Sequence, residues 1–478
     1  MFTLARKAVE MLESRKAEFG DIRIIEERSQ EMSVKSSRLS SLSDNVSLGF
    51  GIRALYKGGW GFASSSELNA REIERTASLA LEIAKASSEI KNKRTTLAPE
   101  PAYKDVWQTP VLKDPFSVPV EEKLNTLFAV DRILAADKRI KSSFSRMFFV
   151  KTRKWYASTA GSEIEQALVC GGAACKAMAA GKNEVQQKSY PGEHSGALSM
   201  GYELIDYLKL TENAGKTREE AIALLTAPQC PSGEMDIILS GDQLALQIHE
   251  SAGHASELDR VLGYEESYAG SSFLTTEKLG KFKYGSEIVN LVADGTLPGG
   301  LATQGYDDDG VRSQRWHIVK NGVLSGYMTN REFAKEIDMD RSRACNRADS
   351  FSSIPITRIC NLSLMPGSWE YADMIKGVKR GIILENNKSW SIDQKRLNFQ
   401  FGCESGRLVE NGKVTKLVKN PVYQGITPQF WNSCDAIASH KYWKLHGVSN
   451  CGKGQPGQLA RMCHASSPAR FRKVRVCM

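Results

Sequence analysis

The sequence predicts an α+β fold: an N-terminal antiparallel sheet with long helices, followed by a β-rich C-terminal domain that carries one helix with the pattern H-E-x-x-x-H. In the first half, groups of alternating apolar residues are separated by single long amphipathic patterns, which is typical of antiparallel rather than doubly wound sheets. In the second half, strand patterns bounded by turn signals dominate from about residue 285.

The N-terminal part begins with a helix and then a group of strands. Residues 4–17 repeat apolar residues at a helical period, and residues 21–65 alternate apolar and polar residues around the turn signals SDN and KGG. Residues 67–91 form a long amphipathic pattern with acidic residues in its first turns, which predicts a second helix. The Pro-rich residues 95–115 predict a loop.

Further helices and strands complete the first half. Residues 119–138 predict a helix, residues 139–181 a return to strands, and residues from about 197 to 225 another helix. The two prolines of the next segment, LTAPQCPSGE, mark a boundary. We therefore predict an N-terminal α+β domain over residues 1–225 and a β-rich domain over residues 233–478.

The second half opens with a strand pattern, MDIILS, and then the helical pattern GDQLALQIHESAGHASE. The turn signals ADG, KNG and ENGK then join patterns typical of hairpin strands, up to a terminal strand in ARFRKVRVCM. A helix near residues 368–380 interrupts these strands.

Composition excludes several classes of protein. The 478 residues are 41% hydrophobic and 25% charged, which is ordinary for a globular protein, and no window of 18 uncharged apolar residues predicts a membrane span. The net charge of +9 is densest at residues 85–94 and 470–476, which we interpret as a solvated face and a terminal strand. No helix-turn-helix, zinc-finger or RNA-recognition motif accompanies these residues, so we expect no specific nucleic-acid partner.

The cysteines and the N-terminus predict a cytoplasmic protein. The ten cysteines are irregularly spaced without a C-x-x-C pair, which favours free thiols in a reducing compartment over a disulfide framework. The first twenty residues carry charges throughout and lack the apolar run of a signal peptide.

The stretch QIHESAGHASELDR, residues 247–260, contains the main candidate site. It holds His249, Glu250 and His254, but the histidines are five residues apart, and on a regular helix they would differ by about 140° in direction. A widened π-turn would bring both rings to one ion, and Gly253 would ease such a turn. If His249 binds Zn²⁺, Glu250 lies where it can take a proton from zinc-bound water.

Two histidines do not make a catalytic zinc site, which needs a third protein ligand and an open position for water. Cys451 is the cysteine that stands out, because it lies in the Gly-rich polar loop HGVSNCGKGQPGQ rather than in an apolar pattern. Each other histidine, taken alone, fits a surface or satisfied core position: His194, His317, His440, His446 and His464.

Several stretches in order resemble the TldD/PmbA family, an atypical family of zinc metalloproteases. They are GFGIRALYKGGWGFASS (49–65), HESAGH (249–254), VADGTLPGG (292–300) and NCGKGQ (450–455), and the similarity extends over nearly the whole chain. The long H-E-x-x-x-H is specific when it is joined to the Cys-Gly-Lys loop. The motif is typical of the TldD branch, whereas PmbA-like (TldE) members lack it and serve as partner subunits.

The resemblance implies that His249, His254 and Cys451 bind Zn²⁺ and that Glu250 is the general base. It also implies hydrolysis of short or unfolded peptides and assembly as a homodimer or as a heterodimer with a PmbA/TldE-like subunit. The chain departs from the family pattern at ITRICNLSLMPG (356–367) and at NNKSWSIDQ (386–394), where the usual glycines are missing. These departures concern the substrate groove rather than the metal site.

Three hypotheses follow. The leading one is a zinc-dependent peptidase in which Glu250 activates zinc-bound water. The second is a non-catalytic partner or regulatory subunit that keeps the fold and the metal for assembly. In the third, His249 and His254 only cap or pack a core helix, which leaves Glu250 and Cys451 unexplained.

Overall fold

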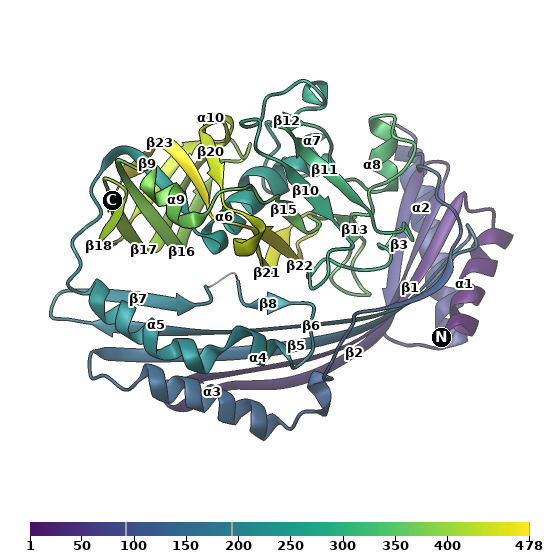
Figure 1. Ribbon diagram of the computed structural model, residues 1–478. Coiled ribbons are helices and arrows are strands. Elements are labelled where there is room, and N and C mark those ends of the chain that lie inside the picture. Colours follow the sequence, from purple (N-terminus) through teal and green to yellow (C-terminus); the bar gives the residue numbers. More distant parts are fainter. Residues whose placement is uncertain (91–92, 193–194, 478) are drawn as a thin grey trace.

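The computed structural model describes residues 1–90, 93–192 and 195–477. Figure 1 shows a long, curved N-terminal sheet along one side of the molecule, with the C-terminal half packed over one of its faces. The predicted α+β class, with an N-terminal antiparallel sheet and a β-rich C-terminal half, is confirmed.

The N-terminal sheet has the strand order β3-β2-β1-β5-β6-β4, with β7 and β8 also paired to β6. All of these pairs are antiparallel except β4–β6, which is parallel. Strand β4 lies within the Pro-rich stretch predicted as a loop. The strands are β1 (Phe19–Lys35), β2 (Arg38–Tyr56), β3 (Gly59–Ser65), β4 (Lys104–Gln108), β5 (Ile140–Ser158), β6 (Glu163–Ala180), β7 (Val185–Tyr190) and β8 (Ala197–Leu198).

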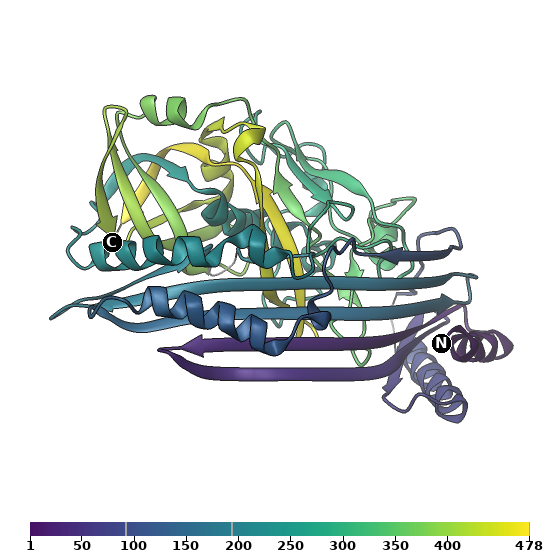
Figure 2. The ribbon, with the colours of Figure 1, turned by 60° about the horizontal axis from the view of Figure 1, so that its bottom comes forward.

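Helices cover one face of this sheet, and Figure 2 shows α3 and α5 running along its long strands. Side chains of β1 alternate between faces, so Ile22 and Ile24 pack under α1 and α2 while Met32 and Val34 pack under α3. The predicted helix near 197–225 is instead β8 and two helices. The helices are α1 (Phe2–Ser14), α2 (Ala70–Ile90), α3 (Val120–Leu134), α4 (Leu204–Leu208) and α5 (Leu210–Leu224).

The opposite face of the sheet holds the C-terminal half through buried ion pairs. Arg53 on β2 donates to Asp309 Oδ1 at 2.8 Å, and Lys154 on β5 donates to Asp308 Oδ1 at 2.5 Å. All four side chains are less than a tenth exposed. Loss of one partner would leave an uncompensated buried charge, so these pairs hold the two halves in one relative placement.

The C-terminal half is built around a closed ring of strands, β16-β9-β23-β19-β17, which the β16–β17 pairing completes. Strand β18 extends the ring from β17, and β20 pairs with β23. These strands are β9 (Gly233–Leu239), β16 (Arg380–Ile392), β17 (Asn398–Glu410), β18 (Lys413–Lys419), β19 (Val422–Ile426), β20 (Cys434–Ile437) and β23 (Ala469–Cys477).

Smaller elements complete the C-terminal half. A sheet of order β12-β11-β10-β15 and the hairpin β21–β22 flank the helix α6. The helix expected near 368–380 is only α9, because strand β16 already begins at Arg380. The elements are α6 (Gly241–Ile248), α7 (Leu258–Val261), α8 (Arg331–Glu336), α9 (Tyr371–Lys376), α10 (Thr427–Asn432), β10 (Leu291–Asp294), β11 (Arg315–Lys320), β12 (Val323–Leu324), β13 (Asn346–Arg347), β14 (Ile356–Thr357), β15 (Leu362–Leu364), β21 (Lys444–Lys453) and β22 (Gln458–Ser466).

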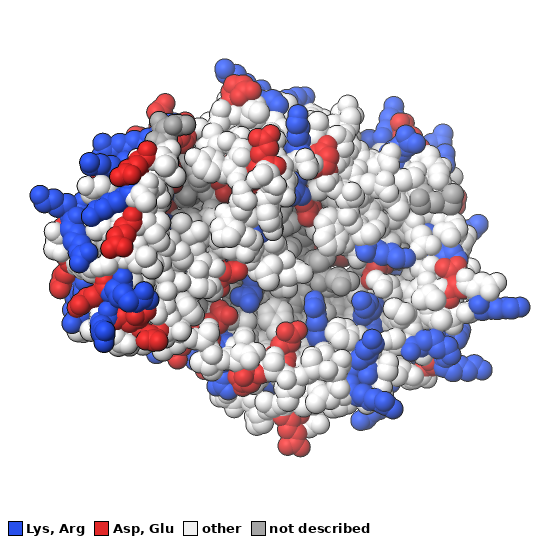
Figure 3. Space-filling model, turned by 180° about the vertical axis from the view of Figure 1, so that it is seen from behind, with Lys and Arg blue, Asp and Glu red and all other residues white. Residues whose placement is uncertain are grey.

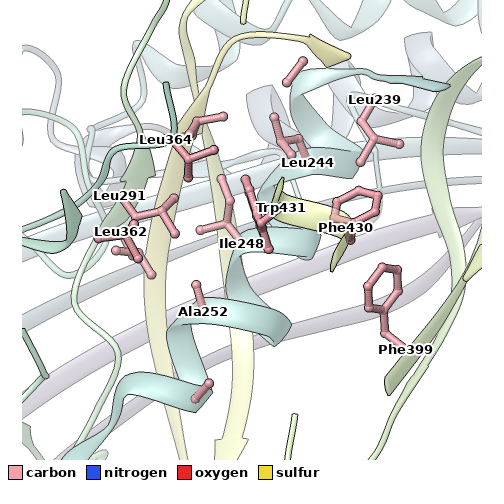
Figure 4. Packing of buried hydrophobic residues seen from close by; sticks show 14 of the residues in the cluster. Leu239, Leu244, Ile248, Ala252, Leu291, Leu362, Leu364, Phe399, Phe430 and Trp431 are labelled. Atoms are coloured by element: carbon pink, nitrogen blue, oxygen red, sulfur yellow. The ribbon is translucent and has the colours of Figure 1, made fainter. Parts of the chain in front are cut away.

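The main core of the C-terminal half fixes the position of α6. Leu244, Ile248 and Ala252 recur every four residues and point into the cluster that also contains Leu362 and Trp431 (Figure 4). Burying each large aliphatic side chain contributes about 1.5–3 kcal/mol. The apolar stripe therefore sets the rotation of α6 and, with it, the direction of the residues that follow.

The helices and the cysteines can be compared with the expectations from composition. No helix among residues 1–90, 93–192 and 195–477 is long and apolar enough to cross a membrane. All ten cysteines are free. Basic and acidic side chains both occur on the face drawn in Figure 3. The division between residues 1–225 and 233–478 stays a prediction.

Candidate metal centre

The helix that carries the H-E-x-x-x-H pattern changes its winding at the motif. Helix α6 runs into a π-turn over His249–Gly253 and then a 3₁₀ turn over His254–Ser256. The π-turn takes up the extra residue, so the rings of His249 and His254 lie side by side with their centroids 4.8 Å apart. The widened turn predicted from the five-residue spacing is therefore present.

Gly253 lies where the turn meets the core. A Cβ atom at this position would come within 2.9 Å of Ile359 Cδ1. A larger residue would require the Ile359 side chain to shift, so glycine provides the closest packing between the turn and the core.

Cys451 reaches the same point from the hairpin β21–β22, almost two hundred residues later. Its Sγ lies 3.4 Å from His254 Nε2, and the potential ligand atoms of His249, His254 and Cys451 all lie within 4.8 Å of one another. The three residues are 3%, 4% and 5% exposed, so water does not solvate this cluster freely.

The hydrogen bonds of His249 and His254 leave the Nε2 atom of each ring free to bind an ion. His464 Nδ1 donates to the Leu362 carbonyl at 2.7 Å, so its Nε2 accepts the hydrogen that His249 Nδ1 donates at 2.8 Å. His254 Nδ1 donates to Glu257 Oε2 at 2.7 Å. Each imidazole is thus held in the tautomer whose Nε2 lone pair is available, as in known metal sites.

Electrostatics also favours ligand-competent forms. Burial lowers the pKa of His249 and lowers the pKa of His254 well below its ordinary value, so both rings are neutral near pH 7. Burial raises the pKa of the Cys451 thiol, whereas the permanent charge of the Arg358 guanidinium acts in the opposite direction and favours the thiolate. Arg358 Nη2 lies 3.1 Å from the Cys451 sulfur and donates to its carbonyl at 2.7 Å.

A buried lysine joins the hairpin to the helical segment. Lys453, two residues after Cys451, donates to both carboxylate oxygens of Asp259 at 2.7 Å. Its Nζ also lies 3.4 Å from Oε1 of Glu257, the residue that orients His254. The lysine side chain is fully buried. The hairpin is therefore held by a charged network that ends on a histidine of the candidate site.

Glu250, on the turn that carries His249, has one carboxylate oxygen occupied. Its Oε2 accepts a hydrogen bond of 2.6 Å from Arg396 Nη1, and Glu250 itself is 6% exposed. Among the residues that the structure describes, Oε1 of Glu250 has no hydrogen-bond partner. That oxygen is free to accept a proton.

The structure brings together all four residues that the sequence singled out, namely His249, Glu250, His254 and Cys451. Sequence reasoning missed their partners, because no local pattern distinguishes them: His464, Glu257, Arg358, Lys453 and Arg396. His317 and His440 belong to other parts of the fold, and His194 lies outside the described residues. His446 lies on β21 opposite His464, outside the group of potential ligands.

The residues present fit zinc. Two imidazole nitrogens and one thiolate are ligand types that Zn²⁺ prefers, and three protein ligands leave a fourth position for water or substrate. The orienting partners of His249 and His254 match the outer contacts that metal-binding histidines usually have.

Sequence profiles of the PmbA/TldA metallopeptidases match three consecutive parts of the chain. They are domain 1 over residues 20–84, the central domain over residues 113–225 and the C-terminal domain over residues 232–474. The resemblance inferred from the sequence motifs is thereby confirmed.

Relatives and a solved structure agree with these matches. A metalloprotease of Methanocaldococcus jannaschii is 30% identical over 441 residues, which cover 91% of this chain and 92% of that protein. A zinc metalloprotease TldD homolog of Saccharolobus solfataricus is 25% identical over 100% of this chain and 99% of its own length. TldE from Thermococcus kodakarensis shares the fold, with a TM-score of 0.77 at 16% identity over 100% of both chains. The chain belongs to the PmbA/TldD metallopeptidase family.

Proposed function

We propose that this protein is a zinc-dependent peptidase that hydrolyses short or unfolded peptides. One observation carries the proposal: His249, His254 and Cys451 place their ligand atoms within 4.8 Å of one another, with Glu250 on the same turn. The metalloprotease names of the relatives support the same reaction class.

The proposed chemistry divides between the metal and the protein. Zinc, when bound, supplies a Lewis acid that polarises the peptide carbonyl and makes water more acidic. His249, His254 and Cys451 would hold it. Glu250 Oε1 takes the proton of the attacking water and then delivers it to the leaving amine, while Oε2 remains on Arg396. The burial of all these groups strengthens each charge interaction.

A cavity whose lining reaches Ala460, but none of the four site residues, is our candidate entry for an extended peptide substrate. It has a volume of about 500 Å³ and lies between the N-terminal sheet and the C-terminal half. Its walls include Thr152 and Lys154 of β5 and Ala460 of β22, which is the strand partner of Cys451. We propose that peptide main chain enters through this cavity, since the polar part of its mixed polar and apolar lining suits hydrogen bonding to an extended segment.

A non-catalytic partner subunit is the second candidate, favoured by the fold shared with TldE. A subunit that only assembles has no need of Glu250 with one free carboxylate oxygen. We therefore place catalysis first. We also propose that the chain works as a homodimer or with a PmbA/TldE-like subunit.

Substitution Glu250→Gln separates these candidates. For a peptidase, the variant retains stoichiometric zinc but loses turnover of an unstructured peptide by about 10²–10⁴-fold, because the amide cannot accept the proton. Zinc is measured by elemental analysis and turnover by peptide cleavage. Glu287→Gln, an exposed position, is the matched control. Full activity of Glu250→Gln, or purified wild-type protein that cannot bind zinc, would exclude the proposal.

A further inference from the structure

Arg396 is a charged residue in direct contact with Glu250 that neither the motif nor the metal explains. It lies in the short turn between β16 and β17, and within the described residues the only hydrogen bond that its guanidinium makes is the one to Glu250. The side chain is 15% exposed, so most of the guanidinium has been removed from water.

The turn holds Arg396 rigidly from both sides. Its backbone N–H donates to the Asp393 carbonyl at 2.9 Å, and its own carbonyl accepts from Thr427 Oγ1 at 3.0 Å. Asp393 Oδ1 accepts in addition from the Leu397 N–H at 2.8 Å. The φ angle of Arg396 is 63°, where glycine or asparagine would be less strained. The presence of arginine there is explained by its side chain and not by the backbone.

The guanidinium uses only part of its donor capacity. Nη1 binds Glu250, whereas Nε is buried and has no hydrogen-bond partner, and no described residue accepts from Nη2. Nε and Nη2 form one edge of the planar group, the edge that matches two oxygens or one carboxylate side by side. A buried donor without a partner costs free energy, which an incoming acceptor would recover.

We propose that Arg396 is a specificity-determining residue of the peptidase site: Nη1 positions Glu250, and the free Nε–Nη2 edge binds an oxygen of the substrate. This inference rests on the proposed function. The same edge would accept either the free C-terminal carboxylate of a peptide or a main-chain carbonyl next to the cleaved bond. In either case the bound oxygen and Glu250 contact the same guanidinium group. Arg396 therefore sets the position of the peptide relative to the proton acceptor.

The test is peptide binding rather than turnover. The full-length chain, freed of metal with a chelator so that it cannot cleave, is titrated with a short unstructured peptide and with its C-terminally amidated twin. Arg396→Gln should weaken binding by about tenfold or more, since it removes a charge-assisted double hydrogen bond. Lys395→Gln, which removes an exposed charge from the same turn, should leave binding unchanged.

The two peptides identify the source of the oxygen. A loss confined to the free acid assigns the edge to the C-terminal carboxylate, and an equal loss for both peptides assigns it to a carbonyl. Unchanged affinity for both peptides would overturn the inference. Arg396→Lys retains the charge without the fork and should also bind more weakly, which provides a second variant if Arg396→Gln does not fold.

This readout is independent of the proposed reaction. Wild-type protein that binds the peptides but cleaves neither after zinc is restored would defeat the peptidase proposal and leave the role of Arg396 in binding intact. Zinc content of reloaded Arg396→Gln should equal that of wild type, because Arg396 contacts none of the three ligand residues through a hydrogen bond.

Discussion

The two segments that build the candidate metal centre are held in different ways. The segment with His249 and His254 is positioned by apolar packing of α6 and by backbone winding, so its spacing is visible in the sequence. The hairpin with Cys451 is positioned by buried cations, Arg358 on its sulfur and Lys453 on Asp259. The relative position of His249 and His254 is therefore determined by local backbone geometry. The position of Cys451 depends on buried charges that only the fold brings together.

Removing a ligand from the helical segment should have the largest effect. His254→Ala leaves two of three ligands, so we expect the variant to lose stoichiometric zinc and peptide cleavage together. Elemental analysis and a cleavage assay measure the two losses. His440→Ala changes an exposed histidine and should retain both. Zinc bound at wild-type stoichiometry in His254→Ala would show that the ligand assignment is incorrect.

Breaking the charged network that holds the hairpin should lower the free energy of unfolding. Lys453→Met leaves the Asp259 carboxylate buried without its cation, and loss of one partner of a buried pair typically costs about 3–5 kcal/mol. Denaturant unfolding of the metal-free protein measures this difference. Lys416→Met, at an exposed position, is the control. A change below about 1 kcal/mol would mean that the hairpin is held by packing alone, as α6 is.

Glu257, which contacts both the helical segment and the buried lysine of the hairpin, should have an intermediate effect on zinc affinity. Glu257 orients His254 and also faces Lys453, and loss of such an orienting partner usually weakens metal affinity about 10- to 100-fold. Glu257→Gln is compared with wild type by competition with a zinc chelator. Glu266→Gln, nearby and exposed, serves as the control. Equal zinc affinity of Glu257→Gln and wild type would show that the charged network around Lys453 does not influence the metal site.

A separate effect concerns the acid sensitivity of the hairpin. Burial lowers the pKa of His446, on β21, to about 4, with a smaller contribution from Lys444. The unfolded chain binds this proton at a higher pH, so His446 reduces the free energy of unfolding as pH falls from about 6.5 toward 4. His446→Gln should lose less stability over that window in denaturant titrations. An identical pH dependence would mean that the folded histidine titrates normally.

Much of the fold followed from local patterns. Alternating residues predicted the long strands of the N-terminal sheet, and the spacing of His249 and His254 together with Gly253 predicted the π-turn. The single helix expected near 197–225 was wrong because the chain breaks at Lys209, whose φ is 52°, into the short helix α4 and the longer helix α5. Strand β4 was missed since its pairing with β6 is non-local and parallel.

The sequence by itself determined the fold class, the family resemblance and the four candidate residues His249, Glu250, His254 and Cys451, because periodicity and motif spacing are local properties. Only the tertiary structure decided which groups surround them. Arg358, Lys453, His464 and Arg396 reach the site from separate elements, and a buried charge or ring has no characteristic spacing along the chain. What they do depends on distance and burial in space, which sequence order does not record.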